Sequence, residues 1–574
     1  MLVIDDLGWN DLGYQQNRKS SVNLGGWRTT DVETPTPIID RLASEGVKLE
    51  NHYVQPLCSP TRATIMTGRY PVHNGIGPSV IQEHFPYGVP ADEVFLSEKF
   101  KSAGYDTHAI GKVRATSCPV RVTRALLRPT HVRIPTRPVQ WHLGFCDERY
   151  TPTFRGFDSF TGFLSGGMDY WTHQMHHDLL DLRSSETTRM PQRLPPPKTD
   201  AHGIYSTHIW RAEVGRILAN RRPGKPLFVY LATQSVHSPV QPPESAVPSH
   251  DSHPAPRERR KYVGVVKMLD AFVGHVETMY IKAGIWDQTV LVCMSDNGAH
   301  VHGGVGNNFP LRGHKGHVWE GGVRGVAFVR GVRDETLAAA GFAVESGGLR
   351  TQLMHSTDWL PTLSSVAGFS LEGTKALDGV DQWTVLTHGG PAKRESVLLN
   401  CAKGGVRDGA IRGSQYKLIF AGGVGGKEGE GHYSIGTHAS LKQLPPLGFE
   451  PDAGTVCEPP QPVDGFFLFD ILNDPRECSN LATGQANQTD EVRMLIELFD
   501  KYRATGLEPL DQLMQKKAAG VWYPPEKDDQ VLGPYVGRCT SCAWGAERSS
   551  LHELYDAWTE TRAKLALLPS EQDS

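Results

Sequence analysis

The sequence contains no run of about 18 consecutive apolar residues, the length that a membrane-spanning helix requires. It also has little charge bias, because 59 Lys and Arg stand against 63 Asp and Glu, for a formal net charge of -4 at pH 7. A surface that attracts nucleic acid over the whole molecule needs an excess of basic charge. The composition therefore predicts no membrane span and no nucleic-acid partner, and its 39% apolar residues are typical of a globular protein.

Cysteine is scarce, and so are the features of a signal peptide. Nine Cys in 574 residues are too few for a small disulfide scaffold but enough for a few disulfides in a secreted enzyme. The N-terminus has no basic stretch followed by an apolar one. Residues 2–4 already have the composition of a buried strand, so either the protein is cytosolic or the start of the chain is missing. We favour a missing start, because three residues are short for a central strand.

Strands and helices alternate over the first part of the chain. Strands are predicted at 106–110, 226–232 and 289–294, and the last two are continuous apolar runs that suit strands buried on both faces of a mostly parallel sheet. Apolar residues recur at helical spacing in 37–46, 205–220 and 262–283. This alternation predicts a large α/β domain over residues 1–390.

The pattern changes after about residue 391. Segments 410–420 and 466–471 have the composition of strands in an antiparallel sheet, and 490–504 has that of a helix. We therefore expect a second, smaller α+β domain with a tail over residues 391–574. A glycosylation sequon, Asn487-Gln488-Thr489, lies within it.

Polar side chains follow the predicted strands at their carboxyl ends, where α/β sheets place their sites. Asp5 and Asp6 follow the strand-like residues 2–4, His237 closes the segment after the strand at 226–232, and Asp296 and Asn297 follow the strand at 289–294. The four Asp and Asn side chains offer only oxygen ligands, which suits a hard cation such as Ca²⁺ better than Zn²⁺. Taken singly, Asp5-Asp6 and segment 295–298 are also explained as turns, and His237 as a hydrogen-bonded histidine of the core.

Cys58 opens the most informative segment, Cys58-Ser59-Pro60-Thr61-Arg62, which continues to Thr67-Gly68-Arg69. A lone Cys is usually a small buried side chain. Here a helix is predicted from Arg62 to Thr67, and the N-terminus of a helix attracts anions. The positive end of the helix dipole would stabilise an anion bound beside Cys58.

Together these segments resemble the sulfatases, and specifically the arylsulfatase B (N-acetylgalactosamine-4-sulfatase) branch. The matching segments, in the order of the family, are 5–11 (Asp-Asp-Leu-Gly-Trp-Asn-Asp), 55–58, 234–237, 295–298, 307–313, Lys315, 319–325 and 358–362. They cover most of residues 2–385, and the match is weaker in the C-terminal third. The resemblance implies an alkaline-phosphatase-like fold, with a large, mostly parallel sheet flanked by helices and a smaller C-terminal α+β domain on an antiparallel sheet.

The resemblance also implies an activity, the hydrolysis of aryl sulfates or of sulfated saccharides of the glycosaminoglycan type. In the family a formylglycine-generating enzyme oxidises the motif cysteine to an aldehyde, whose hydrate attacks sulfur and forms a covalent sulfate ester. The implied ligands of one Ca²⁺ are Asp5, Asp6, Cys58, Asp296 and Asn297. The implied catalytic residues are Cys58, Arg62, Lys112, His142, His237 and Lys315. The implied location is the secretory pathway, either lysosomal or extracellular.

Each catalytic residue takes its role from the resemblance. Arg62 aids the attack, and Lys112 holds the sulfate and the hydrate. His237 or Lys315 gives a proton to the leaving oxygen. His142 removes the proton that lets sulfate leave.

One segment departs from the family, in which Gly-Lys-Trp-His-Leu-Gly is a single run. Here Lys112 and Trp141 are separated by residues 113–140, which are 28 residues with six Arg, four Pro and no Asp or Glu. Valine codons begin with GT and a glutamine codon can end in AG, so the segment has the borders of an intron retained in frame, the interpretation that we favour. The alternative is a basic loop that recruits a polyanionic substrate.

Two other functions stay open. A phosphonate or phosphodiester hydrolase can use the same nucleophile, although segments 234–237 and 319–325 favour a sulfatase. A catalytically impaired, sulfatase-like binding protein is favoured by residues 113–140 and opposed by the complete set of polar site residues.

Overall fold

The structure is a computed structural model of the 574-residue chain. It describes residues 1–16, 35–81, 88–112, 148–175, 179–186, 201–250, 255–301, 305–401, 403, 407–421, 457–484, 487, 489–507, 509 and 510. The predicted insertion 113–140 and the predicted catalytic residue His142 lie outside the described residues.

A large mixed sheet forms the centre of the molecule, with the spatial order β12-β2-β11-β10-β1-β9-β4-β5-β8. Its strands are β1 Leu2–Ile4, β2 Val47–Leu49, β4 Asp106–Lys112, β5 Ser159–Phe163, β8 Arg183–Glu186, β9 Leu227–Thr233, β10 Leu291–Ser295, β11 Ala327–Arg330 and β12 Gly348–Arg350. The neighbours β10, β1, β9, β4 and β5 all run parallel, whereas β11 and β8 run antiparallel to the strands beside them. The carboxyl ends of these five central strands therefore meet at one edge of the sheet.

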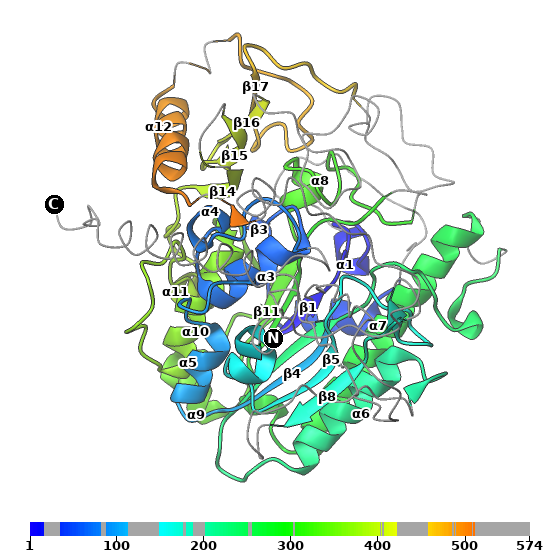
Figure 1. The fold of residues 1–574 in the computed structure, drawn as a ribbon. Coiled ribbons are helices and arrows are strands. Elements are labelled where there is room, and N and C mark those ends of the chain that lie inside the picture. The colour runs from blue at the N-terminus through cyan, green and yellow to red at the C-terminus, as the bar shows by residue number, and fades with distance from the viewer. Residues whose placement is uncertain are drawn as a thin grey trace, which may run out of the picture.

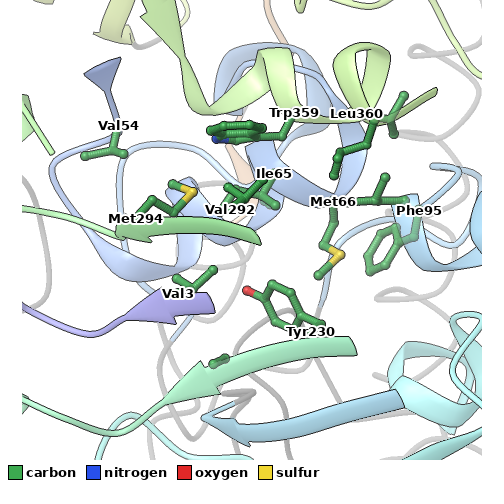
Figure 2. Packing of buried hydrophobic residues seen from close by; sticks show 14 of the residues in the cluster. Val3, Val54, Ile65, Met66, Phe95, Tyr230, Val292, Met294, Trp359 and Leu360 are labelled. Atoms are coloured by element: carbon green, nitrogen blue, oxygen red, sulfur yellow. The ribbon is translucent and has the colours of Figure 1, made fainter. Parts of the chain in front are cut away.

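Helices cover both faces of this sheet (Figure 1). The main ones are α2 Pro37–Ser44, α3 Cys58–Thr67, α5 Leu96–Ser102, α6 Ser206–Ala219, α7 Arg257–Lys282, α10 Trp359–Ala367 and α11 Trp383–His388. Side chains alternate along a strand, so Val3 of β1 packs on the face of α3, α5, α10 and α11, while Leu2 and Ile4 pack on the face of α2, α6 and α7. Figure 2 shows the first of these layers, with Ile65 and Trp359 above the strands.

Shorter elements connect this framework. They are α1 Gly13–Gln16, α4 Pro71–Asn74, α8 Glu320–Val323, α9 Glu335–Leu337, β3 His52–Tyr53, β6 Gln174–Met175, β7 Leu179–Leu180 and β13 Met354–His355. Within the described part of the chain, no helix combines the length and the apolar character needed to cross a bilayer.

A second, antiparallel sheet lies apart from the first and has the order β14-β15-β16-β17. Its strands are β14 Val397–Cys401, β15 Asp408–Arg412, β16 Tyr416–Ala421 and β17 Phe466–Asp470. Helix α12, Asp490–Thr505, packs on one face through Leu495 and Phe499. The other face packs on Trp319 and Leu57 of the large unit. The predicted fold class, a large, mostly parallel sheet between helices with a smaller antiparallel sheet, is confirmed.

One predicted helix begins earlier than expected. The sequence predicts a helix over 62–67, but α3 starts at Cys58. Pro60 lies in the first turn, where a missing backbone N–H removes no hydrogen bond of the helix, so proline does not delay the start. Cys58 is thus the first residue of the helix rather than a residue ahead of it.

Candidate active site and metal centre

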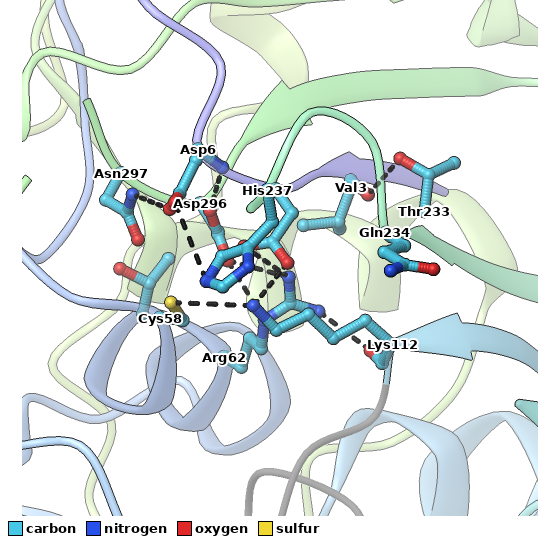
Figure 3. Close-up of polar contacts among 12 residues, drawn as sticks. Val3, Asp6, Cys58, Arg62, Lys112, Thr233, Gln234, His237, Asp296 and Asn297 are labelled. Atoms are coloured by element: carbon cyan, nitrogen blue, oxygen red, sulfur yellow. Dashed lines mark hydrogen bonds and ion pairs between the residues drawn. The ribbon is translucent and has the colours of Figure 1, made fainter. Parts of the chain in front are cut away.

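The loops that follow β1 and β10 meet the N-terminus of α3. One oxygen or sulfur atom from each of four buried side chains lies within 4.8 Å of the others; these side chains are Asp5, Asp6, Cys58 and Asp296. Figure 3 shows Asp6 and Asp296 converging above the helix that carries Cys58. The shared edge of parallel strands brings together residues that are about 290 positions apart in the chain.

Asn297 completes the oxygen cluster. Its Nδ2 donates to Asp6 Oδ1 at 2.8 Å. Its Oδ1 is buried and accepts no hydrogen bond from the described residues. A buried oxygen without a partner costs free energy, and a cation on the cluster would satisfy it. Carboxylate and amide oxygens are ligands of Ca²⁺, so the donor set fits the predicted metal.

Two positively charged side chains, Arg62 and Lys112, pair with carboxylates of the cluster. The Nε and Nη2 atoms of Arg62 donate to Asp296 Oδ2 at 3.0 and 2.7 Å, and its Nη1 donates to the carbonyl oxygen of Lys112 at 3.0 Å. The Nζ of Lys112 forms an ion pair with Asp5 and lies 3.9 Å from Cys58 Sγ. Arg62 and Lys112 are both buried.

Two further nitrogen groups face Asp6. Lys315 Nζ lies 2.7 Å from Asp6 Oδ1, and His237 Nε2 lies 3.6 Å from Asp6 Oδ2. His237 Nδ1 lies 2.6 Å from the carbonyl oxygen of Ser238, which can only accept, so Nδ1 carries a proton. The Nε2 atom of His237 is therefore the one that faces the cluster.

Burial and crowding shift the pKa values of these groups. Burial raises the pKa of Asp5 to about 7, against the opposing effect of Lys112. Burial also opposes the charge of Asp6, yet Lys315 and His237 bring its pKa well below its usual range. Burial lowers the pKa of His237 well below its ordinary value, and Lys112 and Lys315 lower it further. The site thus holds carboxylates and cations at close range, away from water, where electrostatic interactions are strong.

The structure brings together nine of the ten side chains predicted to form the site. They are Asp5, Asp6, Cys58, Arg62, Lys112, His237, Asp296, Asn297 and Lys315. The tenth, His142, lies outside the described residues. Their assignment as catalytic residues and ligands stays a prediction.

Asp11 joins distant segments of the chain, a role that the sequence does not indicate. Its buried carboxylate accepts hydrogen bonds from the backbone N–H groups of Gly8 and Asn307 at 3.1 and 3.0 Å. It also accepts from Tyr262 Oη at 2.7 Å and pairs with Arg259 at 3.0 Å. Asp11 belongs to a family-like segment, but Arg259, Tyr262 and Asn307 are about 250 to 300 residues away from it, so the sequence held no signal for these three contacts.

The comparisons with known proteins agree with this geometry. The family model described as Sulfatase matches residues 1–119 and 138–369. The chain is 34% identical to arylsulfatase J of Mus musculus over 403 residues, which are 70% of this chain and 57% of that relative. It is 28% identical to arylsulfatase A of Bos taurus over 521 residues, which are 88% of this chain and 87% of that relative.

The chain thus spans a little over half the length of the first relative, 57%. The crystal structure of Ps i-CgsB in complex with k-i-k-neocarrahexaose has a TM-score of 0.63 to this chain at 23% identity, over 90% of this chain and 96% of that one. At that identity the likeness shows the fold alone. The narrower resemblance to the arylsulfatase B branch stays a prediction. The family model covers more than half of the chain, and the chain therefore belongs to the sulfatase family, whose members are sulfuric ester hydrolases.

Proposed function

We propose that this protein hydrolyses sulfate esters, of aryl alcohols or of saccharides, with a nucleophile made from Cys58 and with one bound Ca²⁺. The observation that carries the proposal is the meeting of Cys58, four oxygen-bearing side chains and several cations in one buried site. A sulfate ester is an anion, so its hydrolase must neutralise the group and present a nucleophile to sulfur.

The nucleophile would be formylglycine at position 58, produced by a formylglycine-generating enzyme. As its hydrate it would supply one hydroxyl to attack sulfur and a second whose deprotonation releases sulfate. Cys58 is the first residue of the 10-residue helix α3. The backbone N–H groups of Cys58 and Ser59, at the start of that first turn, would favour a negative charge beside them.

The metal would be held by Asp5, Asp6, Asp296 and Asn297 together with position 58. When bound, Ca²⁺ would offset the charge of the carboxylates and of the sulfate. The fit rests on the oxygen-only side chains of the two strand-end loops and on the unsatisfied Oδ1 of Asn297.

The Arg, Lys and His side chains of the site would bind the sulfate group and transfer protons. Arg62 and Lys112 lie next to position 58 and would hold the sulfate oxygens. Lys315 and His237 lie across Asp6 and would face the leaving oxygen, where one of them supplies a proton. We assign the final deprotonation to His142.

The location and the substrate class follow from separate observations. We place the protein in the secretory pathway, lysosomal or extracellular, because Cys457 and Cys478 form a disulfide and disulfides persist in oxidising compartments. The sequon at Asn487 agrees with a glycoprotein. The similarity to N-acetylgalactosamine-6-sulfatase of Homo sapiens, 25% identical over 400 residues, supports a saccharide substrate. We also propose that residues 1–390 and 391–574 are the two domains.

The decisive experiment is a rate comparison. The full chain, made in cells that contain the maturation enzyme, should release nitrophenol from nitrophenyl sulfate faster than from nitrophenyl phosphate or bis-nitrophenyl phosphate. Cys58→Ala should abolish turnover, whereas Cys401→Ala, at a buried cysteine in β14, should preserve it. Faster turnover of the phosphodiester would favour the phosphonate and phosphodiester reading. Binding of a sulfated saccharide without any turnover would favour the impaired binding protein.

A further inference from the structure

Asn308 is a buried side chain that joins two loops of the site. Its Nδ2 donates to the carbonyl oxygens of Ala299 and Gly313 at 3.0 and 3.3 Å, and its Oδ1 accepts from the backbone N–H of Ala299 at 2.9 Å. Ala299 comes two residues after Asn297, and Gly313 comes two residues before Lys315. One amide group therefore connects the loop of the metal centre to the segment that carries Lys315.

The segment with Lys315 is irregular, so individual hydrogen bonds hold it in place, among them the one from the Gly316 N–H to the Pro56 carbonyl oxygen at 2.7 Å. Residues 305–319 contain none of the helices or strands of the structure. Buried backbone groups in such a segment need partners outside a regular ladder. The backbone N–H of Lys315 also donates to Ala299 O, at 3.1 Å. The carbonyl oxygen of Ala299 thus accepts hydrogen bonds from the Lys315 N–H and from the Asn308 side chain. The N–H of Ala299 donates to the same Asn308 side chain.

Asn308 is one of the groups that hold the backbone on both sides of Lys315, and it is the one that joins this segment to the loop after β10. Lysine has a long and flexible side chain, so the place of its Nζ is set by where its backbone is held. Here Nζ reaches both oxygens of Asp6, at 2.7 and 2.8 Å. A shift of about 1 Å in a catalytic group can cost roughly a hundredfold in rate.

We infer that Asn308 is a positioning residue that acts through Lys315 on the leaving oxygen of the substrate. This inference rests on the proposed function. Asn308→Asp keeps the shape and the acceptor but loses both donated hydrogen bonds, and its carboxylate repels the two carbonyl oxygens. The backbone of Lys315 should then move away from the loop of the metal centre.

The test measures kcat/KM of the full chain for two sulfate esters. Nitrophenyl sulfate carries the better leaving group, and phenyl sulfate carries the poorer one. A group that protonates or stabilises the leaving oxygen matters most when that oxygen leaves poorly. Asn308→Asp should therefore lower kcat/KM for phenyl sulfate about tenfold more than for nitrophenyl sulfate. Lys315→Ala should show the same preference, and the double variant should lose little more than Lys315→Ala alone.

The matched control is Asn74→Asp. Asn74 is also fully buried, and its side chain hydrogen-bonds to Arg69 O and to the N–H of Ile76, in the region of α4. This variant should not change the ratio of the two rates. Asn308→Ser, which keeps a smaller polar group, serves in the same assay if the Asp variant does not fold.

The outcomes separate the two proposals. No hydrolysis of either ester by the unaltered chain would overturn the proposed function. An active unaltered chain in which Asn308→Asp or Asn308→Ser slows both esters equally, or adds its full effect to that of Lys315→Ala, would overturn only the role of Asn308.

Discussion

At the scale of single residues, each carboxylate of the proposed metal centre also pairs with a Lys or Arg side chain of the protein. Asp6 faces Lys315, Asp5 pairs with Lys112, and Asp296 accepts two hydrogen bonds from Arg62. A substitution at any of these carboxylates therefore removes a ligand and frees a neighbouring cation at once. The two effects can be separated by measuring metal binding apart from turnover.

Asp296→Asn should abolish the stabilisation of the protein by Ca²⁺. A ligand that binds only the folded state at about 100 times its Kd raises the free energy of unfolding by about 2.7 kcal/mol. We expect added Ca²⁺ to raise the Tm of the unaltered chain in a calorimetric scan and to leave the Tm of Asp296→Asn unchanged. Asp270→Asn, at a buried carboxylate that caps α2, should lower the starting Tm but keep the rise. An equal rise in Asp296→Asn would remove this residue from the metal site.

At the scale of elements, helix α7 holds the loop that carries Asp5 and Asp6, two of the proposed metal ligands. Arg259 and Tyr262, in the first turns of α7, hold the carboxylate of Asp11. Asp11 in turn holds Gly8 and Asn307 by their backbone N–H groups. The loop after β1 and the segment that leads to Lys315 are thus tied to one rigid helix.

Tyr262→Phe should loosen this tie without changing the shape of the core. A hydrogen bond to a charged acceptor contributes about 1.5–3 kcal/mol. We therefore expect urea denaturation to show a free energy of unfolding lower by about 1.5–3 kcal/mol, and calorimetric titration to show weaker Ca²⁺ binding. Tyr280→Phe, near the other end of the same helix, should leave Ca²⁺ affinity unchanged. Unaltered affinity in Tyr262→Phe would show that α7 supports the fold but not the metal loop.

The elements show how far sequence reasoning reaches. Apolar runs predicted β9 and β10 to within about two residues, because strands buried on both faces need them. The motif at Cys58 predicted that Cys58 and Arg62 lie in one site, because spacing on one helix is local, and their catalytic roles stay predictions. Asn308 and Tyr262 could not be predicted, since their roles depend on partners brought near by folding. Helix α3 starts at Cys58, four residues before the predicted start, because a proline in the first turn of a helix removes no hydrogen bond.

At the scale of the whole molecule, buried charges join the two sheets. Lys417 of β16 lies 2.9 Å from Glu320 and 2.8 Å from Glu477, and all three side chains are fully buried. Glu320 belongs to α8 of the large unit, and Glu477 follows the second sheet in the chain. Two carboxylates thus share one ammonium at the contact between the predicted domains, so the contact depends on protonation.

The stability of this contact should fall as the pH rises. Burial raises the pKa of Glu477 from 4.5 to about 7, against the opposing effect of Lys417. Between pH 4.5 and about pH 7 the folded state therefore binds more protons than the unfolded state. The stabilisation from protonated Glu477 is complete below pH 4.5 and is lost as the pH rises through about 7. Residue 477 cannot titrate in Glu477→Gln. Between about pH 5 and about pH 8 the free energy of unfolding of this variant should therefore rise by about 1–3 kcal/mol relative to that of the unaltered chain. Chemical denaturation at both pH values measures this. The exposed Glu497→Gln is the control, and a parallel decline in Glu477→Gln would contradict the assignment.

Residues 113–140 should reduce activity. The family model matches the chain on both sides of 120–137, within this segment. Deleting 113–140 joins Lys112 to Trp141 and returns Lys112 and His142 to the spacing of the family. We expect better expression and at least about tenfold faster hydrolysis of an aryl sulfate, because positioning dominates such catalysis. Equal or higher activity with the segment present, lost when its arginines are replaced, would establish a substrate-recruiting loop instead.

The central claim, a nucleophile made from Cys58, is tested most directly by the mass of the peptide that contains this residue. The full chain is produced in cells with the formylglycine-generating enzyme, shown to hydrolyse nitrophenyl sulfate, digested and measured by mass spectrometry. We predict a peptide in which the sulfur of Cys58 has been lost and an oxygen gained, as an aldehyde requires. An unmodified Cys58 thiol throughout a fully active preparation would contradict the account.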